Sequence, residues 1–343
     1  MDTIRTGTRS WALHVTRGRG GCLVLGLLVA CGSPSAPEEN RSAWEAGPPL
    51  PTPLFGMAAV TYRGSVWVAG GGGVNQGSDV VYRLDAAGGW EEATRLPDRL
   101  GAVQLAVAAD SLYLFAASTE MADGFQVPNT RIWVLNPATA TWSERSGLPD
   151  QRRLWRVVGV GEKIVLVGGE VSGGGTMRTV ADTAAIYEAG PGQWHYSTTA
   201  MEVPRAAPFG AAINGSVYVF SGFPVGGVGL ALTVERYDVE ADAWTTLAEQ
   251  PPGALTTELN QAVAVEGGVV HVLGGRSQGT GAVVSPDHLV FDPAAGTWSF
   301  GDLLPVGRSA AGAAAVGGVV YVVGGLSSLS PFRVTDRVDV LRP

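Results

Sequence analysis

The sequence predicts an all-β protein built from six copies of one four-stranded unit, and three observations carry that prediction. A short aliphatic run closing on or near Gly-Gly returns six times along the 343 residues. A second run follows each time and ends at an acidic residue or Asn, and in the first five copies a tryptophan stands five or six residues later. One copy is too small to bury both of its apolar faces alone, so neighbouring copies must pack against each other.

The first strand pair is the clearest element of each copy. Its runs occupy residues 63–71, 110–115, 162–169, 214–222, 267–275 and 317–325. Turn pairs such as Asn214-Gly215 and Gly267-Gly268 allow the positive φ that two-residue hairpins need. The residues that follow are β-branched and aromatic and too few for a helix, which indicates buried strands. In the second copy Ala116-Ala117 replaces the diglycine, so the register of that copy is the least defined.

The outer half of each copy carries an acid or Asn and then a tryptophan. The pairs are Asp85 and Trp90, Asn136 and Trp142, Glu188 and Trp194, Asp238 and Trp244, and Asp292 and Trp298. The sixth copy reaches Pro343 without a tryptophan, but Trp44 stands six residues before Leu50-Pro51, as Trp90 stands before Leu96-Pro97. The segment around Arg41–Ala46 is therefore predicted to be the fourth strand of the last unit.

That pairing would also protect the last sheet. An unpaired edge strand exposes a row of backbone donors and acceptors to misassociation. If the N-terminal strand completes the final unit, the gap is filled and the two ends of the domain are joined. Deleting Ser42 to Pro49 is therefore expected to destabilise the protein far more than its size suggests.

The diglycine, the following acid and the spaced tryptophan resemble the kelch family of β-propellers, from Trp44 to the C-terminus. The resemblance implies a six-bladed kelch-type β-propeller at residues 42–343, with four-stranded antiparallel blades and the last blade closed by the N-terminal strand. It also implies that the repeat tryptophans are packed in the core between blades.

The first 30 residues are predicted to be an export signal. Four arginines precede an apolar run, Cys22 to Ala30, which is too short for a membrane anchor. The run ends Leu28-Val29-Ala30-Cys31 and resembles the lipobox of bacterial lipoproteins, which implies diacylation of Cys31, a flexible tether over residues 31–41 and an address at the outer membrane or cell surface. The alternative is an ordinary signal peptide with a coincidental cysteine.

Charge and composition restrict the partners and the chemistry. The chain has 23 basic and 31 acidic residues, and removing the four Arg and one Asp of the signal leaves 19 against 30. An acidic surface argues against nucleic-acid binding. His195, His271 and His288 are assigned to three different repeats, so neither a metal site nor a cofactor is predicted. We expect a monomer that contacts the membrane through its lipid only.

Arginines recur in the loops that lead into the first strand of a copy. They are Arg99, Arg152, Arg153, Arg156, Arg205 and Arg308. These loops and the long loops after the diglycines are expected on one face of the propeller, where inward-pointing arginines would form a cationic mouth for carboxylate or phosphate groups. The structural alternative is that they bond to loop carbonyls and hold the blades in register. Trp155, beside the cluster, is a candidate stacking platform.

Two functions remain open at this point. The first is a non-catalytic module, anchored at the surface, that binds a protein or glycan partner through this face. The alternative is an enzyme similar to the periplasmic sialic-acid mutarotases, in which Arg152, Arg153, Arg205 and Arg308 hold a carboxylate and Glu258 is the general acid or base.

Overall fold

The chain divides into Met1–Arg41 and Ser42–Pro343. The structure, a computed structural model, describes residues 43–342 apart from 74–76, 121–125, 129–130, 146, 149, 151, 173–177, 227–228, 250–256, 260–261 and 278–282. Its regular elements there are β-strands, as the sequence predicts. Nowhere in this described part is there a helix with the length and apolarity needed to cross a bilayer.

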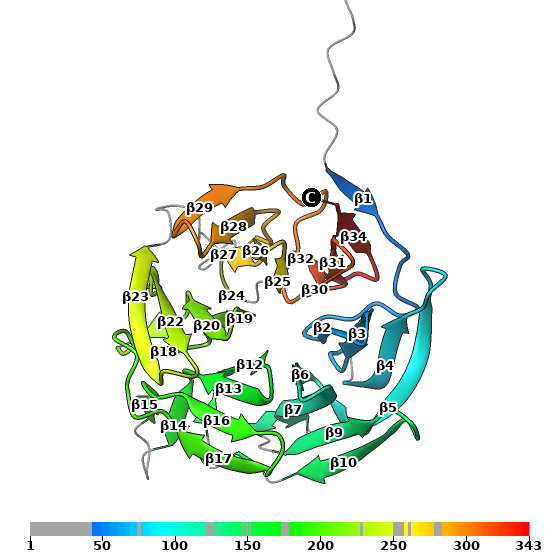
Figure 1. Cartoon of the computed structure of the whole chain (residues 1–343). Helices are drawn as coiled ribbons and strands as arrows, with labels where there is room; N and C mark the ends of the chain where they lie inside the picture. The colour runs from blue at the N-terminus through cyan, green and yellow to red at the C-terminus, as the bar shows by residue number, and fades with distance from the viewer. Residues whose placement is uncertain are drawn as a thin grey trace, which may run out of the picture. The chain divides into compact units, whose positions relative to one another are not determined.

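The described residues form six antiparallel sheets whose four successive strands run from the centre outward (Figure 1). We call them blades 1 to 6. Blade 1 contains β2 (Ala58–Tyr62), β3 (Ser65–Ala69), β4 (Ser78–Leu84) and β5 (Trp90–Leu100); blade 2 contains β6 (Ala102–Ala108), β7 (Ser111–Glu120), β9 (Ile132–Asn136) and β10 (Thr141–Arg145). Blade 3 contains β12 (Arg156–Val160), β13 (Lys163–Val167), β16 (Ala185–Glu188) and β17 (Gln193–Tyr196); blade 4 contains β19 (Phe209–Ile213), β20 (Ser216–Phe220), β22 (Thr233–Asp238) and β23 (Ala243–Glu249). Blade 5 contains β25 (Ala262–Glu266), β26 (Val269–Leu273), β28 (His288–Asp292) and β29 (Thr297–Phe300); blade 6 contains β30 (Gly312–Val316), β31 (Val319–Val323), β34 (Val338–Leu341) and β1 (Trp44–Ala46).

Blade 6 combines the two ends of the propeller, as predicted. Strand β1 pairs antiparallel with β34, with Trp44 opposite Leu341 and Ala46 opposite Asp339. The ladder continues past β1, because the Gly47 amide donates to the carbonyl of Val338 at 2.9 Å. The outer edge of the last blade is therefore covered by the start of the propeller.

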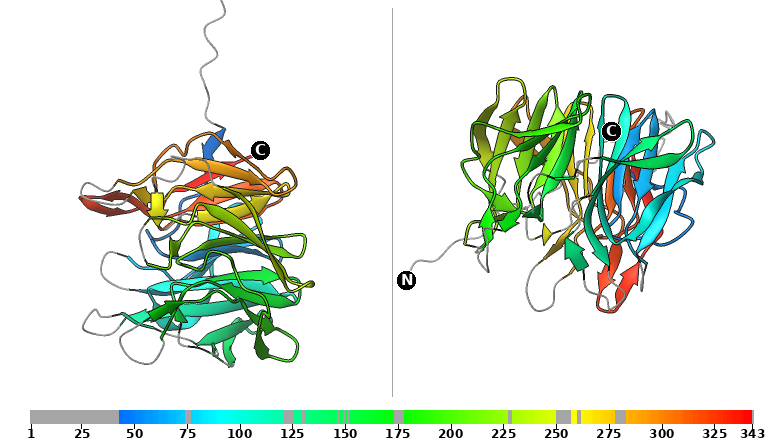
Figure 2. Two further views of the ribbon diagram at one scale, coloured as in Figure 1. Left: turned by 90° about the vertical axis from the view of Figure 1, so that its left-hand side faces the viewer. Right: turned by 90° about the horizontal axis from the view of Figure 1, so that it is seen from below.

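Short accessory strands lie in the loops that enter a blade or follow its second strand, and they define one loop-rich face. They are β8 (Gln126–Pro128), β11 (Arg152–Arg153), β14 (Glu170–Ser172), β15 (Arg178–Val180), β18 (Arg205–Ala206), β21 (Phe223–Pro224), β24 (Thr257–Leu259), β27 (Arg276–Ser277), β32 (Leu326–Leu329) and β33 (Phe332–Val334). In blades 3, 4 and 5 the loop entering the blade pairs with the loop after the diglycine position, as β11–β14, β18–β21 and β24–β27. The two sets of loops therefore share a face, as expected, and the β32–β33 hairpin projects from the ring in Figure 2 (right, red).

The core is divided into six clusters, each bridging two neighbouring blades and each containing one repeat tryptophan. Trp44, for example, packs with Leu304, Val320 and Leu341 against Ala264 of blade 5. The sequence prediction that these tryptophans pack between blades is confirmed, although only Trp44 is buried and the other five are partly buried against their clusters. Burial between blades, repeated around the ring, replaces the single central core of an ordinary domain.

The diglycines end the second strand of a blade by their backbone conformation. Gly168 and Gly169 have φ values of 62° and 95°, a region that favours glycine, and β13 stops just before them at Val167. In blade 2 the corresponding Ala116 keeps its strand conformation, and β7 runs on to Glu120, where it pairs with β8. The missing glycines thus lengthen one strand without changing the order of the sheet.

One close approach between inner strands gives a direct test of this packing. A Cβ added to Gly159 of β12 would lie 2.1 Å from the carbonyl oxygen of Val107 in blade 2. We expect Gly159→Ala to lower the free energy of unfolding by about 1–3 kcal/mol, because the two inner strands must separate. Gly190→Ala, whose Cβ would meet no atom within 4 Å, is the matched control. Equal melting temperatures for the two variants would contradict the proposed contact.

Candidate functional site

The inner strands of all six blades line a cavity of about 410 Å³ at the centre of the propeller, which we call the channel. Its lining is mostly small and apolar, with Ala, Gly and Val from every blade. Arg156 is the one ionisable side chain among the described lining residues. Gln104 also lines it, but its amide is used internally, donating to the Trp155 carbonyl at 2.6 Å and accepting from the Val157 amide at 2.9 Å.

Arg156 is placed near the loop-rich face by its position in the strand. It is the first residue of β12 and pairs with Val167, the residue just before the diglycine of blade 3. Its Nε donates a long hydrogen bond of 3.4 Å to the carbonyl of Pro208, and its guanidinium carbon lies 5.3 Å from the ring centre of Phe209. No acidic side chain within the described part of the chain forms an ion pair with it.

The surroundings of Arg156 make its charge costly. Burial lowers the pKa of the Arg156 guanidinium to about 10, so it remains protonated at neutral pH. The long hydrogen bond to Pro208 and the ring of Phe209 replace only part of the hydration that this cation loses, because no described carboxylate pairs with it. The position therefore favours an external anion.

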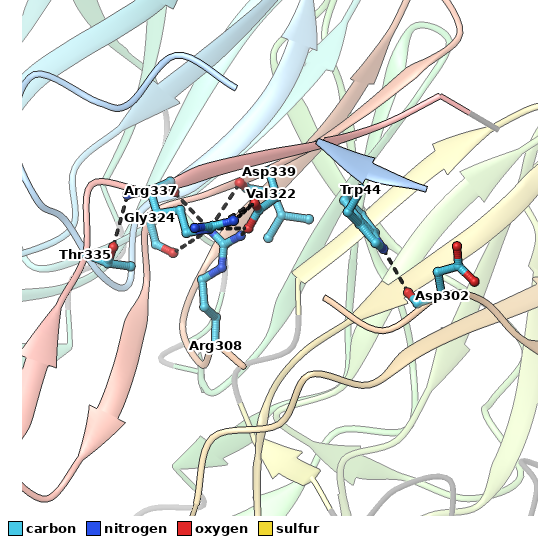
Figure 3. Close-up of polar contacts among 8 residues, drawn as sticks. All are labelled: Trp44, Asp302, Arg308, Val322, Gly324, Thr335, Arg337 and Asp339. Carbon is cyan, nitrogen blue, oxygen red and sulfur yellow. Dashed lines mark hydrogen bonds and ion pairs between the residues drawn. The ribbon is translucent and has the colours of Figure 1, made fainter. Parts of the chain in front are cut away.

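Arg308 and Arg205 have the opposite arrangement. Both are buried, and each forms an ion pair with an equally buried acid of its own blade, Asp339 for Arg308 and Glu235 for Arg205. Figure 3 shows Arg308 also donating to backbone carbonyls, among them those of Arg337 at 2.8 Å and Gly324 at 3.3 Å. Burial lowers the pKa of both arginines against the opposing effect of the acid. These contacts tie the entering loop to the third strand of the blade, β22 for Arg205 and β34 for Arg308.

The remaining arginines of the predicted mouth are dispersed. Arg152 is buried against Asp150 at 2.6 Å and donates to the Gly168 carbonyl at 3.2 Å. Arg153 pairs with Glu170 across β11 and β14 at 2.6 Å, and Arg99 is exposed near the end of β5. Among the six candidates, only Arg156 lines the channel as described.

For Arg152, Arg205 and Arg308 the contacts therefore match the structural alternative. Acids and carbonyls within their own blades accept hydrogen bonds from these guanidinium groups, which ties them to their blades and does not bring them into a shared cationic mouth. Sequence reasoning missed the buried acids Glu235 and Asp339. The available signal was spacing, since these acids follow their arginines by 30 and 31 residues in the repeats of blades 4 and 6.

The prediction that Trp155 is a stacking platform is wrong. Only 4% of Trp155 is exposed, its Nε1 donates to the Arg152 carbonyl at 3.0 Å, and its ring packs edge-on against Phe115. It belongs to the core cluster between blades 2 and 3.

Two further candidates lie partly or wholly outside the described residues. The backbone of Glu258 is in β24, on the loop-rich face, but its side chain is not among those described. Cys31 is also outside the described residues.

The histidines need a correction. His271 and His288 belong to one blade, on β26 and β28, and Nδ1 of His271 lies 2.9 Å from Nε2 of His288. Their separation of 17 residues hid this, because strand pairing brings them together. His195 is exposed on β17. Within the described residues, no group of three His, Cys, Asp or Glu side chains could hold a metal ion.

Comparison with known proteins supports the fold. No family model matches the chain. The chain is 26% identical over 261 residues to Kelch-like protein 34 of Homo sapiens, covering 72% of this chain and 38% of that protein. It is 23% identical over 214 residues to Kelch-like protein terF of Aspergillus terreus, covering 59% of this chain and 45% of that protein.

The chain thus spans less than half the length of either of these relatives. The solved structure of YjhT superposes with a TM-score of 0.70 at 15% identity, covering 85% of this chain and 95% of that one, which shows a common fold. With the blades described above, these likenesses identify the chain as a kelch-repeat β-propeller.

Proposed function

We propose that this propeller is a non-catalytic binding module that holds a carboxylate of a protein or glycan partner at the loop-rich end of the channel. The observation that carries the proposal is Arg156, a partly buried cation in an apolar channel without an acidic partner among the described residues. Arg156 takes over the role that the sequence suggested for six arginines.

The chemistry of the channel suits one carboxylate. A guanidinium binds a carboxylate with two parallel hydrogen bonds, and most donors of Arg156 remain for an external acceptor. The cavity of about 410 Å³ is within the range of small-ligand sites.

Exposed apolar side chains extend the site over the loop-rich face. Leu154, Val225, Val283 and Phe332 lie in the entering loops or in the loops after the diglycine positions and are exposed. Apolar groups around a polar anchor are common in interfaces. They support a partner that is larger than the channel and that inserts one acidic group into it.

The described residues support binding more strongly than catalysis. Proton transfer needs a group such as a carboxylate or imidazole near the reacting atoms. The part of the channel lining that the structure describes contains no Asp, Glu, His, Cys, Lys or Tyr.

The location that we propose rests on the sequence pattern before the propeller. Lipid on Cys31, followed by the tether over residues 31–41, would hold the propeller at a bacterial outer membrane or cell surface. Metabolic labelling with a palmitate analogue, compared between the full chain and Cys31→Ser, tests this point independently of any ligand. Equal labelling of the two would refute lipidation at Cys31.

The sialic-acid mutarotase-like function is the second candidate. One observation favours it: β24 brings Glu258 to the same face as Arg156. NMR of anomeric exchange of N-acetylneuraminate, with wild type and Glu258→Gln, decides the matter. Exchange that is faster with wild type and lost in the variant would establish the enzyme and displace the binding module.

The binding proposal is tested by replacing its cation. We expect Arg156→Gln to weaken binding of a carboxylated probe at least about tenfold, since a charge-assisted pair contributes on the order of 1.5–3 kcal/mol. Isothermal titration of protein lacking residues 1–31, with N-acetylneuraminate and an Asp- and Glu-rich peptide as separate probes, measures it. Arg153→Gln, which alters an exposed pair on the same face, is the control.

Two results would refute the proposal. One is unchanged affinity in Arg156→Gln for a probe that the wild type binds. The other is no binding of either probe by wild type. An equal loss of affinity in Arg156→Gln and Arg153→Gln would instead indicate that several arginines of the loop-rich face bind the probe together.

The affinity should also depend on pH in one direction. Burial lowers the pKa of Arg156 to about 10, so the charged form persists through neutral pH and is lost as the pH rises through that value. We expect constant affinity for the carboxylated probe from pH 7 to 9 and a fall above about pH 10, moved upward to the extent that the bound anion stabilises the cation. Titrations across this range, with circular dichroism to verify folding, would contradict the assignment if the affinity remained flat.

A further inference from the structure

Blade 5 differs from the other blades at two buried positions. His271 stands three residues before its diglycine, where blades 4 and 6 have Tyr218 and Tyr321. His288 stands four residues before Asp292, a position that is apolar in the preceding blades, as in Val234 of blade 4. The histidines are 4% and 2% exposed. A polar pair has therefore replaced an aromatic and an aliphatic side chain in the interface between blades 5 and 6, which we call the seam.

The contacts of the pair define its tautomers. The carbonyl oxygen of Asp302 can only accept, so Nδ1 of His288, 3.2 Å away, must donate to it. The Nε2 of neutral His288 is then an acceptor and takes its hydrogen bond from Nδ1 of His271 at 2.9 Å. This leaves Nε2 of His271 with a lone pair, buried and without a hydrogen-bond partner among the described residues.

Asp302 connects this relay to the strand that closes the ring. Trp44 of β1 donates from its indole Nε1 to the same Asp302 carbonyl at 2.8 Å, as Figure 3 shows. The amide of Ala43 donates to the Asp302 carboxylate at 2.8 Å. The rings of Trp44 and His288 also meet edge to face, with centres 5.5 Å apart. The histidine pair and β1 thus hold the same residue from two sides.

Neither imidazole of this pair forms a hydrogen bond with a described acidic side chain. A cavity of about 540 Å³ borders both rings, and its charged lining residues are Glu266 at the end of β25 and Asp302. Blade 6 contributes Gly318 and Leu341 to it, and Ala43 lines it just before β1. A charged His271 would be desolvated without a compensating acid, and for the pKa of His288 burial outweighs the opposing effect of Asp302.

We propose that the His271–His288 pair is an acid-sensitive latch on the closure of the propeller. With both rings neutral, the relay holds Asp302 where it receives the hydrogen bonds of β1. A proton on His271 Nε2 places an unpaired cation in the seam, and a proton on His288 Nε2 sets two N–H groups against each other. Either event favours a state in which the seam has opened and the rings reach water.

The direction of the pH effect follows from the same contacts. Burial and the neighbouring His288 lower the pKa of His271 to about 4, and burial lowers the pKa of His288 against the opposing effect of Asp302. The unfolded chain therefore takes up protons first, near the usual value of 6.5. Stability from the neutral pair is complete above that pH and declines as the pH falls towards 4. The pKa change of His271 alone, from 6.5 in the open state to about 4 in the closed state, should make the equilibrium constant for opening the seam about 30-fold larger at pH 5 than at pH 8.

The experiment compares the seam at pH 8 and pH 5 in protein lacking residues 1–31. Hydrogen exchange of the Trp44–Ala46 segment, corrected for intrinsic rates, and thermal melting are measured for wild type and for the double variant His271→Tyr, His288→Val, which carries the residues of blade 4. We expect acid to speed exchange in β1 and lower the melting temperature of wild type, and the double variant to lose most of this pH dependence. His195→Gln, an exposed histidine, should behave as wild type.

An equal pH dependence in wild type and the double variant would overturn the latch. Nitrogen-15 NMR of the wild-type imidazoles adds a test that needs no variant to fold. Both buried histidines should have the proton on Nδ1 at pH 8. A proton on Nε2 of His271 would overturn the relay.

Discussion

Deleting residues Ser42 to Pro49 should abolish cooperative folding or lower the melting temperature more than any single substitution in the propeller. The deletion removes β1, exposes the ladder edge of β34 and empties the position of Trp44, which is 5% exposed. Truncating a buried tryptophan by itself costs about 3–5 kcal/mol. The loss extends to blade 5, because Trp44 and Ala43 both donate to Asp302.

Thermal melting, monitored by circular dichroism, measures this effect. Two controls separate the loss of β1 from the loss of the preceding segment or of a surface ion pair. Removing only residues 32–41 leaves β1 in place and should change little. Glu45 also lies in β1, and Glu45→Gln removes its exposed ion pair with Arg342. This change should alter the free energy of unfolding by no more than about 0.5 kcal/mol. A deletion of 42–49 that melts with the wild type would show that β1 does not close the ring.

Replacing Glu235 by Gln should destabilise the protein by about 3–5 kcal/mol, because Arg205 would remain as a buried cation without its counter-ion. Both side chains of this pair are fully buried. Glu235 also accepts the backbone amides of Glu202 at 2.7 Å and Val203 at 3.1 Å, so it holds the loop that enters blade 4. The charge is therefore needed for the shape of the loop as well as for the ion pair.

A double-variant cycle distinguishes this pair from surface pairs. We expect Arg205→Met with Glu235→Leu to be less destabilised than the sum of the two single variants, since the double variant leaves neither charge buried alone. Arg83→Met, which breaks an exposed pair with Glu91, should cost little. Additive losses at the Arg205 pair, measured by urea unfolding, would show that the two charges do not depend on each other.

The arginines show how much of the candidate site can be predicted from the sequence. Their recurrence in the entering loops could be read directly, and so could the face on which those loops gather. Whether each guanidinium reaches the channel depends on an acid that another strand brings to it, about 30 residues away for Arg205 and Arg308. Arg156 reaches the channel because it is the first residue of an inner strand.

The predictions for Trp155 and for the histidine pair are wrong for a related reason. Trp155 follows a loop and was predicted to be accessible, but Gly169 allows it to pack closely, with the tryptophan Cβ 3.0 Å from where a glycine Cβ would lie. His271 and His288 were assigned to separate repeats because their distance along the chain does not reveal which strands are neighbours. Both errors concern contacts between segments that are separated along the chain and meet only in the folded blade.

By itself the sequence determined the repeat, the strands within it and the partnership between the first and last strands of the propeller. These follow from local rules: turns that need glycine, alternating burial, and one tryptophan for each interface between blades. Only the tertiary structure decided which polar groups are used up inside a blade and which stay available in the channel or the seam. That distinction depends on the burial of each charge and on its nearest acceptor, and both arise when blades pack against one another.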